Sequence, residues 1–305
     1  MNFKNYLDQS EVFGKVAAAA QKLNLPTYVV GGYVRDLVLR RDSKDIDFTC
    51  VGSGISLAQE VAKGFDKHVP LSVFKNFGTA MLKLEDGELE FVGARKESYR
   101  LDSRKPIVED GTLIEDLERR DFTINSMAIS LNAQDYGELI DPLGGLEDIR
   151  KRNIRTPLDP VITFSEDPLR MMRAVRFAAQ LNFDIDPDTF QAIQESATRL
   201  SIISAERIID ELNKIIKTPK PSYGFKLLFA SGLLAEFFPE MVELQGVDSV
   251  DDKSHKDNFY HTLQVLDNVS KVSDDLWLRW AAILHDIAKP ATKRFSPKVG
   301  WTFHG

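Results

Sequence analysis

The stretch TYVVGGYVRDLVLRRDSKDIDFTCV, residues 27–51, decides the fold of this chain. TYVV predicts a short buried strand, and Gly31 and Gly32 follow it as a sharp turn where backbone can approach a ligand. YVRDLVLR then predicts a helix, and IDFTCV predicts a second strand. The turn and the positive end of the helix would present N–H groups to a triphosphate, with Arg35 as a charged donor one turn in. Paired glycines also occur for packing alone, so the acids that follow carry more weight.

Two of these acids, Asp45 and Asp47, lie on one face of the second strand, because side chains alternate along a strand. There the two carboxylates repel each other and are partly desolvated, a conflict that a divalent cation resolves. The same D-x-D pattern is common on solvated strand faces, but the preceding glycine turn favours a metal site. If the alternating strand GELEFVGA lies beside IDFTCV, Glu90 supplies a third carboxylate; an exposed edge-strand glutamate is the alternative.

Composition describes an ordinary globular protein of about two to three domains, with 305 residues, 43% of them hydrophobic and 28% charged. No apolar run approaches the ~18 residues of a membrane span, and the first residues lack a signal-peptide pattern, which predicts a cytoplasmic protein without a membrane partner. A net charge of −7 argues against a nonspecific nucleic-acid coat but allows a local basic cleft. Cys50, the single cysteine, faces away from the acids and is interpreted as a buried structural thiol.

The order of patterns predicts an α+β head followed by an all-helical remainder. Short β-rich runs mix with helical segments over residues 27–140, and helical periodicity dominates after about residue 160. Helices are expected near 166–182, 187–197, 204–217, 222–231, 258–272 and 275–289. The segment 100–116 has little periodicity and is interpreted as a mobile loop, while TPLDP (156–160) and KTPKP (217–221) suit junctions.

One predicted helix combines acids with a row of arginines. Ser165 fits an N-cap, and Glu166, Asp167 and Pro168 fit the first turn. Three cations then recur at every third position beside an apolar stripe, namely Arg170, Arg173 and Arg176. Like charges at this spacing repel, so the row favours binding of an anion.

Five motifs in order resemble those of the class II tRNA nucleotidyltransferases, the CCA-adding enzymes, and of the related bacterial poly(A) polymerases. They are GGYVRD, DID, RRDFTINSMA, LIDPLGGLEDIR and EDPLRMMRAVRFAAQL, and the resemblance covers about residues 25–240. It implies a polymerase β-like nucleotidyltransferase head with a mixed sheet, followed by a helical neck and body. The expected parts are an N-terminal helical segment (1–26), the head (27–155), the neck (156–220), the body (221–250) and a partial HD domain (251–305).

The resemblance also implies roles for single residues. Asp45 and Asp47 would hold Mg²⁺, which would lower the pKa of the RNA 3′-hydroxyl and bind the triphosphate. By this resemblance Arg120, Arg173 and Arg176 would contact the triphosphate or the sugar, in addition to the nucleotide contacts that the turn itself predicts for Gly32 and Arg35. Asp121 and Asn125 would orient neighbouring groups or the ribose, or else serve as helix caps. The implied partners are the tRNA 3′ end, CTP and ATP; the sequence does not set the oligomeric state.

In that family an EDxxR motif selects the base, and it maps onto Glu166, Asp167 and Arg170. A carboxylate accepts a hydrogen bond from the exocyclic amine of cytosine or adenine, while the guanidinium donates to ring acceptors. Uracil and guanine present a carbonyl oxygen at the amine position and leave the carboxylate unpaired. One pair of residues thus admits C and A and rejects U and G.

The C-terminal segment resembles an HD domain, whose metal site needs a histidine, a His-Asp pair and a later aspartate. His261, His285 and Asp286 supply the first three, but no aspartate follows Asp286. We therefore expect an incomplete second metal site in a chain truncated within this domain.

These patterns favour template-independent addition of C, C and A to tRNA from CTP and ATP. The alternatives are an A-adding or poly(A)-polymerising relative, an HD-type phosphohydrolase with a vestigial head, and a noncatalytic RNA-binding protein.

Overall fold

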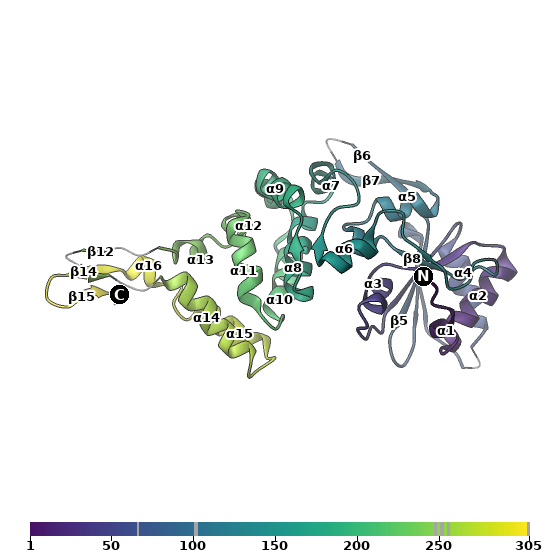
Figure 1. The fold of residues 1–305 in the computed structure, drawn as a ribbon, viewed down its shortest axis with the longest axis horizontal. Helices are drawn as coiled ribbons and strands as arrows, with labels where there is room; N and C mark the ends of the chain where they lie inside the picture. Colours follow the sequence, from purple (N-terminus) through teal and green to yellow (C-terminus); the bar gives the residue numbers. More distant parts are fainter. Residues whose placement is uncertain (66, 101–102, 247–248, 251–252, 255–256, 304–305) are drawn as a thin grey trace. The chain divides into compact units, whose positions relative to one another are not determined.

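The computed structural model describes residues 1–65, 67–100, 103–246, 249–250, 253–254 and 257–303. The chain divides into two compact units, Met1–Asp159 and Pro160–Gly305, and the division falls within TPLDP. The first unit contains a large mixed sheet and the second is mostly helical, which confirms the α+β head and the helical remainder (Figure 1). None of the helices in the described ranges has the length and apolar character needed to cross a membrane.

A seven-stranded sheet in the order β3-β4-β5-β2-β1-β8-β9 forms the centre of the first unit. Its strands are β1 (Thr27–Val30), β2 (Ile46–Cys50), β3 (Leu71–Phe74), β4 (Thr79–Lys83), β5 (Glu88–Gly93), β8 (Ala128–Ser130) and β9 (Leu139–Ile140). Neighbouring strands are antiparallel except β2 and β5, which are parallel. In this register Asp47 lies between Val30 of β1 and Glu90 of β5, so the condition for a third neighbouring carboxylate is met.

One face of this sheet carries the aromatic core of the unit. The rings of Phe48 and Phe91 stack with centroids 5.0 Å apart, and Phe13 of α2 (Glu11–Leu23) meets Phe48 edge-on at 6.3 Å. Helix α4 (Gly54–Lys63) packs against the same strands. Cys50 is fully buried, and this burial raises the pKa of its thiol to about 12, which confirms the predicted buried thiol. Asp47 alternates with these residues and projects from the opposite face.

Helix α5 (Leu113–Glu118) covers part of that opposite face. A reciprocal capping box between Thr112 and Glu115 begins the helix. Leu113 and Leu117 pack with Val30 of β1 and with Ala128 of β8 in one buried cluster. This packing fixes α5 to the strand that ends in the glycine turn.

The described residues of the segment 100–116 do not form the irregular loop that was predicted. β6 (Arg95–Arg100) and β7 (Ser103–Asp110) form an antiparallel hairpin, and α5 follows three residues after β7. Pairing between strands supplies the backbone hydrogen bonds here, and local periodicity does not report such pairing. The remaining elements of this unit are α1 (Lys4–Leu7), α3 (Gly32–Val38), η1 (Lys75–Phe77), η2 (Thr123–Asn125), α6 (Gly145–Lys151) and β10 (Asn153–Ile154).

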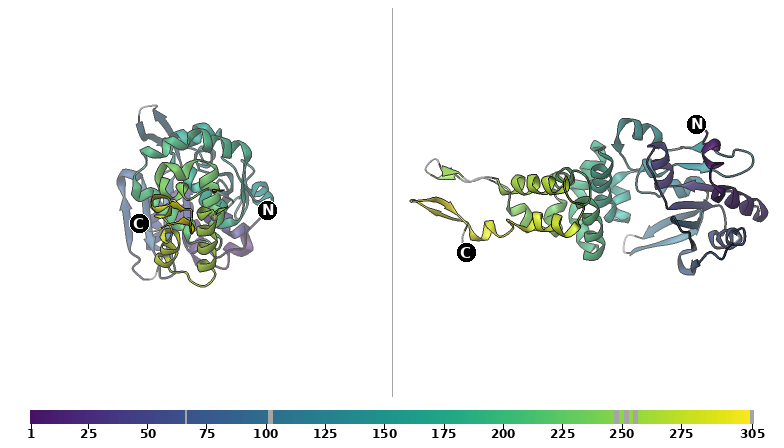
Figure 2. Two further views of the ribbon diagram at one scale, coloured as in Figure 1. Left: turned by 90° about the vertical axis from the view of Figure 1, so that its left-hand side faces the viewer. Right: turned by 90° about the horizontal axis from the view of Figure 1, so that it is seen from below.

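The second unit is a stack of helices (Figure 2), in which α8 packs on α10 and α11, α11 on α14, and α14 on α15. The helices are α7 (Pro160–Glu166), α8 (Leu169–Leu181), α9 (Pro187–Ser196), η3 (Ala197–Ile202), α10 (Ala205–Ile216), α11 (Pro221–Ala230), α12 (Leu233–Phe237), α13 (Pro239–Glu243), α14 (Asn258–Ser270), α15 (Leu276–Leu284) and α16 (Lys289–Thr292). The fully buried Arg279 donates to the carbonyl oxygens of Ile216 and Thr218, which ties α15 to the end of α10.

The predicted N-cap at Ser165 is wrong. Ser165 and Glu166 lie inside α7, the helix is interrupted at Asp167 and Pro168, and α8 begins at Leu169. Proline lacks an N–H and disfavours helical backbone in the residue before it. Pro168 is the N-cap residue of α8, and Asp167 Oδ1 accepts a hydrogen bond from the first helical N–H, that of Leu169, at 3.1 Å.

The C-terminal region is also less helical than expected. The helix predicted over 275–289 ends at Leu284, and Pro290 lies in the first turn of the short α16, a position that suits a residue without an N–H. Two-residue and three-residue strands complete the unit: β11 (Asp184–Ile185), β12 (Ser249–Val250), β13 (Lys253–Ser254), β14 (Arg294–Ser296) and β15 (Gly300–Thr302). β12 pairs with β13, and β14 pairs with β15.

Candidate active site

The turn at Gly31 is the point where the candidate residues of the first unit converge. Gly31 has φ 75° and ψ −141°, a backbone conformation that essentially only glycine adopts. A β-carbon built on Gly31 would lie 2.9 Å from Arg120 Nη1 and 3.2 Å from Asp47 Oδ2. The absence of a side chain therefore lets a guanidinium and a carboxylate approach the same piece of backbone.

Substitution of this glycine tests the strain directly. Gly31→Ala is expected to lower the free energy of unfolding by about 1–3 kcal/mol, because it combines a disfavoured backbone conformation with two close contacts. Gly14→Ala is the matched control, since Gly14 lies exposed within α2 and its β-carbon would meet nothing within 4 Å. Urea unfolding followed by circular dichroism should show the control stabilised by about 0.5–1 kcal/mol. Equal changes in both variants would contradict this account of Gly31.

The two acids differ in their surroundings. Asp45 directly precedes β2, is exposed, and accepts a hydrogen bond from the Glu88 N–H at 3.1 Å. Asp47 is partly buried, and its pKa is raised, first by burial and also by the negative charge of Asp45, while Arg120 acts in the opposite direction. A carboxylate whose charged form is disfavoured in this way gains from a nearby cation.

Glu90 lies beside Asp47 on the neighbouring strand, as expected. The side chain of Glu90 is exposed, but partial desolvation and then the charge of Asp47 raise its pKa, while Arg95 and Arg120 act in the opposite direction. Within the described residues, however, Asp45, Asp47 and Glu90 do not bring three ligand oxygens within 4.8 Å of one another. A sparse set of carboxylates of this kind can hold a hard divalent cation together with oxygen ligands from other molecules.

Arg120 reaches this corner from the end of α5. Its Nη2 donates to Asp116 Oδ2 at 3.0 Å, and Arg119 binds the other oxygen of the same carboxylate. Asp116 is completely buried and was not among the residues predicted from motifs. The spacing D-x-x-R-R on a helix is the signal that could have found it, since residues three and four apart share one helix face.

Arg35, Asn125 and Asp121 form a buried network beneath the turn. Arg35 Nη1 donates to Asn125 Oδ1 at 2.8 Å, and Asn125 Nδ2 donates to Asp121 Oδ1 at 2.9 Å. Arg35 also pairs with Asp36, and its guanidinium lies 3.4 Å from the β-carbon position of Gly32. Arg35 is only 5% exposed, so its guanidinium belongs to this network beneath the turn.

The base-selecting residues predicted in the second unit lie around the break between α7 and α8. Arg170 pairs with Glu166 at 3.1 Å, four residues earlier. Asp167 Oδ2 pairs with Arg207 of α10 at 3.1 Å, while its Oδ1 caps α8 at Leu169. Arg207 is a second residue that motif spacing missed, because its partner lies forty positions away in the sequence.

The arginine row on α8 is not uniformly open to an anion. Arg176 is 8% exposed, pairs with Glu211 of α10 and lies 3.8 Å from the centre of the Phe177 ring. Burial alone would raise the pKa of Glu211, but Arg176, Lys214 and Arg173 together lower it. The acid that neutralises Arg176 is therefore Glu211 of the neighbouring helix α10, and this ion pair connects α8 to α10. Arg173, which is partly exposed, is better placed than Arg176 to meet a substrate.

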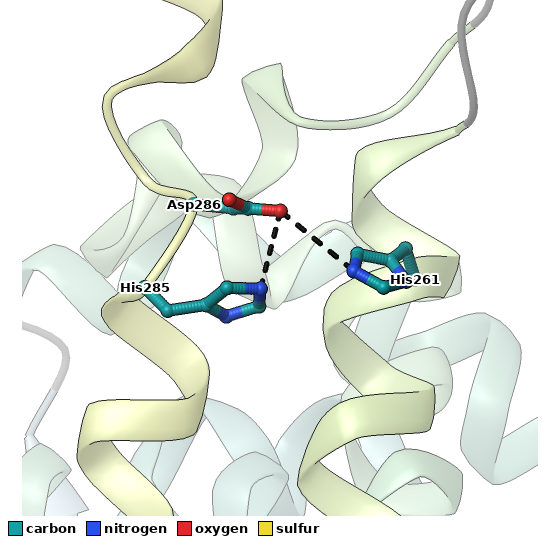
Figure 3. A group of neighbouring side chains, drawn as sticks. All are labelled: His261, His285 and Asp286. Atoms are coloured by element: carbon teal, nitrogen blue, oxygen red, sulfur yellow. Dashed lines mark ion pairs between the residues drawn. The ribbon is translucent and has the colours of Figure 1, made fainter.

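A second cluster lies between α14 and the end of α15 (Figure 3). The ligand atoms of His261, His285 and Asp286 lie within 4.8 Å of one another. Asp286 Oδ2 is 3.1 Å from His285 Nε2 and 3.9 Å from His261 Nε2, and it also pairs with Lys289 Nζ at 2.7 Å. The lysine already supplies positive charge to the carboxylate that a metal ion would use.

Comparison with known proteins matches three parts of the chain to family models. Residues 27–155 match the poly A polymerase head domain, residues 182–244 match the probable RNA and SrmB-binding site of polymerase A, and residues 258–304 match the HD domain. All three matches agree with the resemblance drawn from the motifs.

Individual relatives agree with these models. The A-adding tRNA nucleotidyltransferase of Aquifex aeolicus (strain VF5) is 44% identical over 197 residues, which are 63% of this chain and 23% of that protein. The CCA-adding enzyme of Geobacillus sp. (strain WCH70) is 41% identical over 228 residues, 75% of this chain and 54% of that enzyme. The chain thus spans about a quarter of the first relative and about half of the second.

A solved structure extends the likeness over most of the chain. The crystal structure of a tRNA nucleotidyltransferase complexed with a primer tRNA and an incoming ATP analog is 32% identical and has a TM-score of 0.70. The match covers 89% of this chain and 75% of that chain. The sequence motifs, the mixed sheet and these matches together show that the chain belongs to the tRNA nucleotidyltransferase family with a poly(A) polymerase-type head domain.

Proposed function

We propose that this protein adds C, C and A to the 3′ end of tRNA from CTP and ATP without a nucleic-acid template, and that each addition releases diphosphate. The observation that carries the proposal is the corner at Gly31, where the Asp47 carboxylate and the Arg120 guanidinium approach one glycine backbone. Nucleotidyl transfer needs this combination, because a triphosphate brings negative charge to acids that must themselves bind a cation. The name of the CCA-adding relative and the tRNA complex of the solved structure support nucleotide addition to tRNA.

Each group at the corner has a separate task. Asp45 and Asp47 would hold Mg²⁺, which when bound favours deprotonation of a hydroxyl and neutralises phosphate charge. Arg120 offers Nη1 to the triphosphate, as its other terminal nitrogen is held by Asp116. Asp121, Asn125 and the buried guanidinium of Arg35 keep the turn in place.

Choice of the base is assigned to Asp167 and Arg170. Asp167 accepts from the exocyclic amine of cytosine or adenine, and Arg170 donates to the ring nitrogen or carbonyl acceptors of the same base. Arg207 and Glu166 hold these two side chains at 3.1 Å each. Arg173 is the remaining candidate for contact with the triphosphate or the sugar.

The test is incorporation of labelled CTP and ATP, singly and together, into tRNA that ends before CCA and into tRNA that ends in CC. We expect two C residues and one A on the first substrate when both nucleotides are present, with strict dependence on Mg²⁺. Incorporation of A alone, even with CTP present, would defeat C addition and leave A addition. Binding of tRNA without any incorporation would defeat enzymatic transfer altogether.

Addition of A alone is the second candidate. The observation that favours it is the 44% identity with an A-adding enzyme over 197 residues, which are 63% of this chain. The case for an HD-type phosphohydrolase is weaker, because Lys289 already pairs with Asp286, the only carboxylate in the cluster with His261 and His285. Replacing both Asp45 and Asp47 by Ala separates these activities: it should abolish incorporation and leave a phosphatase untouched.

A further inference from the structure

Asp116 is a buried carboxylate shared by two consecutive arginines. It lies on α5 with no exposed surface, and its Oδ1 accepts from Arg119 Nε at 3.0 Å and from Arg119 Nη2 at 2.6 Å. Its Oδ2 accepts from Arg120 Nη2 at 3.0 Å. Burial alone would raise the pKa of Asp116, but Arg120 and then Arg119 outweigh burial and lower it. The carboxylate is therefore charged and engaged at both oxygens.

The Arg120 guanidinium is held on one side and directed on the other. Nη2 is bound to Asp116, whereas Nη1 approaches the turn at Gly31 and the Asp47 carboxylate. Its buried Nε has no hydrogen-bond partner among the described residues. A metal cation bound by Asp45 and Asp47 would neutralise their charge, so these acids could not hold Arg120 in place. Asp116 is the carboxylate that would still hold it.

The helix that carries Asp116 is coupled to the turn by packing. Leu113 and Leu117, on either side of Asp116, pack with Val30, the residue before Gly31. A rigid apolar contact thus fixes the distance between the carboxylate that holds Arg120 and the turn that Arg120 faces.

We propose that Asp116 is a positioning residue for nucleotide binding, which holds Arg120 so that Nη1 meets the triphosphate. Arg119 binds the other oxygen of Asp116 from one helical turn away, an ion pair that contributes to the stability of α5. This inference rests on the proposed function, since it assumes that a triphosphate occupies the corner beside Asp47. A purely structural ion pair would stabilise α5 without affecting nucleotide affinity.

The test measures ATP and CTP binding to the full chain by isothermal titration calorimetry with Mg²⁺, together with kcat, KM and the melting temperature. Asp116→Asn should weaken nucleotide binding and raise KM by about 10–100-fold, with kcat changed less than about threefold. Arg120→Gln should have a similar effect. The double variant Asp116→Asn/Arg120→Gln should bind nucleotide no more weakly than Arg120→Gln alone, because both substitutions act through one contact. Arg119→Gln is the matched control and should leave KM within about threefold while lowering the melting temperature.

A second variant protects the test against misfolding. Asp116→Asn combined with Arg119→Gln removes one charge of each sign, so it retains the net charge of the buried corner and should still raise KM. Wild-type nucleotide affinity in this variant would overturn the positioning role. So would a loss of affinity in Asp116→Asn/Arg120→Gln that equals the product of the two single-variant losses. Failure of the wild-type chain to incorporate nucleotide would overturn the proposed function instead, and nucleotide affinity would still report on Asp116.

Discussion

Asp47→Asn is expected to reduce nucleotide incorporation by at least about 10³-fold while leaving the fold intact or slightly more stable. The amide has nearly the same shape but carries no charge, so it is a poor ligand for Mg²⁺. The pKa of Asp47 is raised in the folded state by burial and by Asp45. A carboxyl group with a raised pKa is most favourable to the fold when protonated, and this contribution is lost as the pH rises through its unfolded and folded pKa values. At neutral pH the charged acid therefore opposes folding, and the amide removes this opposition.

The measurement pairs steady-state incorporation with thermal unfolding, each with and without Mg²⁺. Wild-type protein should melt at a higher temperature with Mg²⁺, because a ligand of the folded state stabilises it, and Asp47→Asn should lose most of this increase. Asp86→Asn is the matched control, an exposed acid in the turn between β4 and β5. If Asp47→Asn kept more than a tenth of the wild-type rate, the assignment of Asp47 as a metal ligand would be wrong.

Local patterns predicted the part of the site that is continuous in sequence. TYVV, the two glycines and IDFTCV became β1, the turn and β2, and GELEFVGA became β5, whose pairing with β2 meets the condition that placed Glu90 beside Asp47. These features depend on strand periodicity and on a turn conformation that one residue type accepts, and both can be read over short distances. The predicted distribution of buried Cys50 and surface acids followed from the same alternation.

The remainder depends on partners that lie far apart in sequence. Glu211 neutralises Arg176 from another helix, and Arg207 meets Asp167 across forty residues, so neither pair has a local signature. Asp116 did have a local signature, in its spacing to Arg119 and Arg120. Only the structure, in which Asp116 is buried, distinguishes it from an ordinary ion pair on a helix surface. The hairpin of β6 and β7 was missed because strand pairing, not local preference, stabilises it.

Asp167→Asn is expected to change which nucleotides are incorporated. The carboxylate only accepts hydrogen bonds, whereas the amide can also donate one to O4 of uracil or O6 of guanine. We expect incorporation of CTP and ATP to fall and the preference for CTP over UTP to drop by about 10²–10⁴-fold, because a base that left the carboxylate unpaired now finds a donor. The Oδ1 cap on Leu169 is retained in the amide, so α8 should remain folded.

The control for this specificity change is Arg207→Gln. Arg207 holds Asp167 Oδ2 at 3.1 Å but has no direct part in the proposed base recognition. Its loss should lower the rates with CTP and ATP together and keep UTP and GTP excluded, since the carboxylate is misplaced but chemically unchanged. Single-nucleotide incorporation with all four triphosphates separates the two variants. An unaltered order of preference in Asp167→Asn would show that this carboxylate does not read the base, and selection would then have to be sought at Arg170 and Glu166.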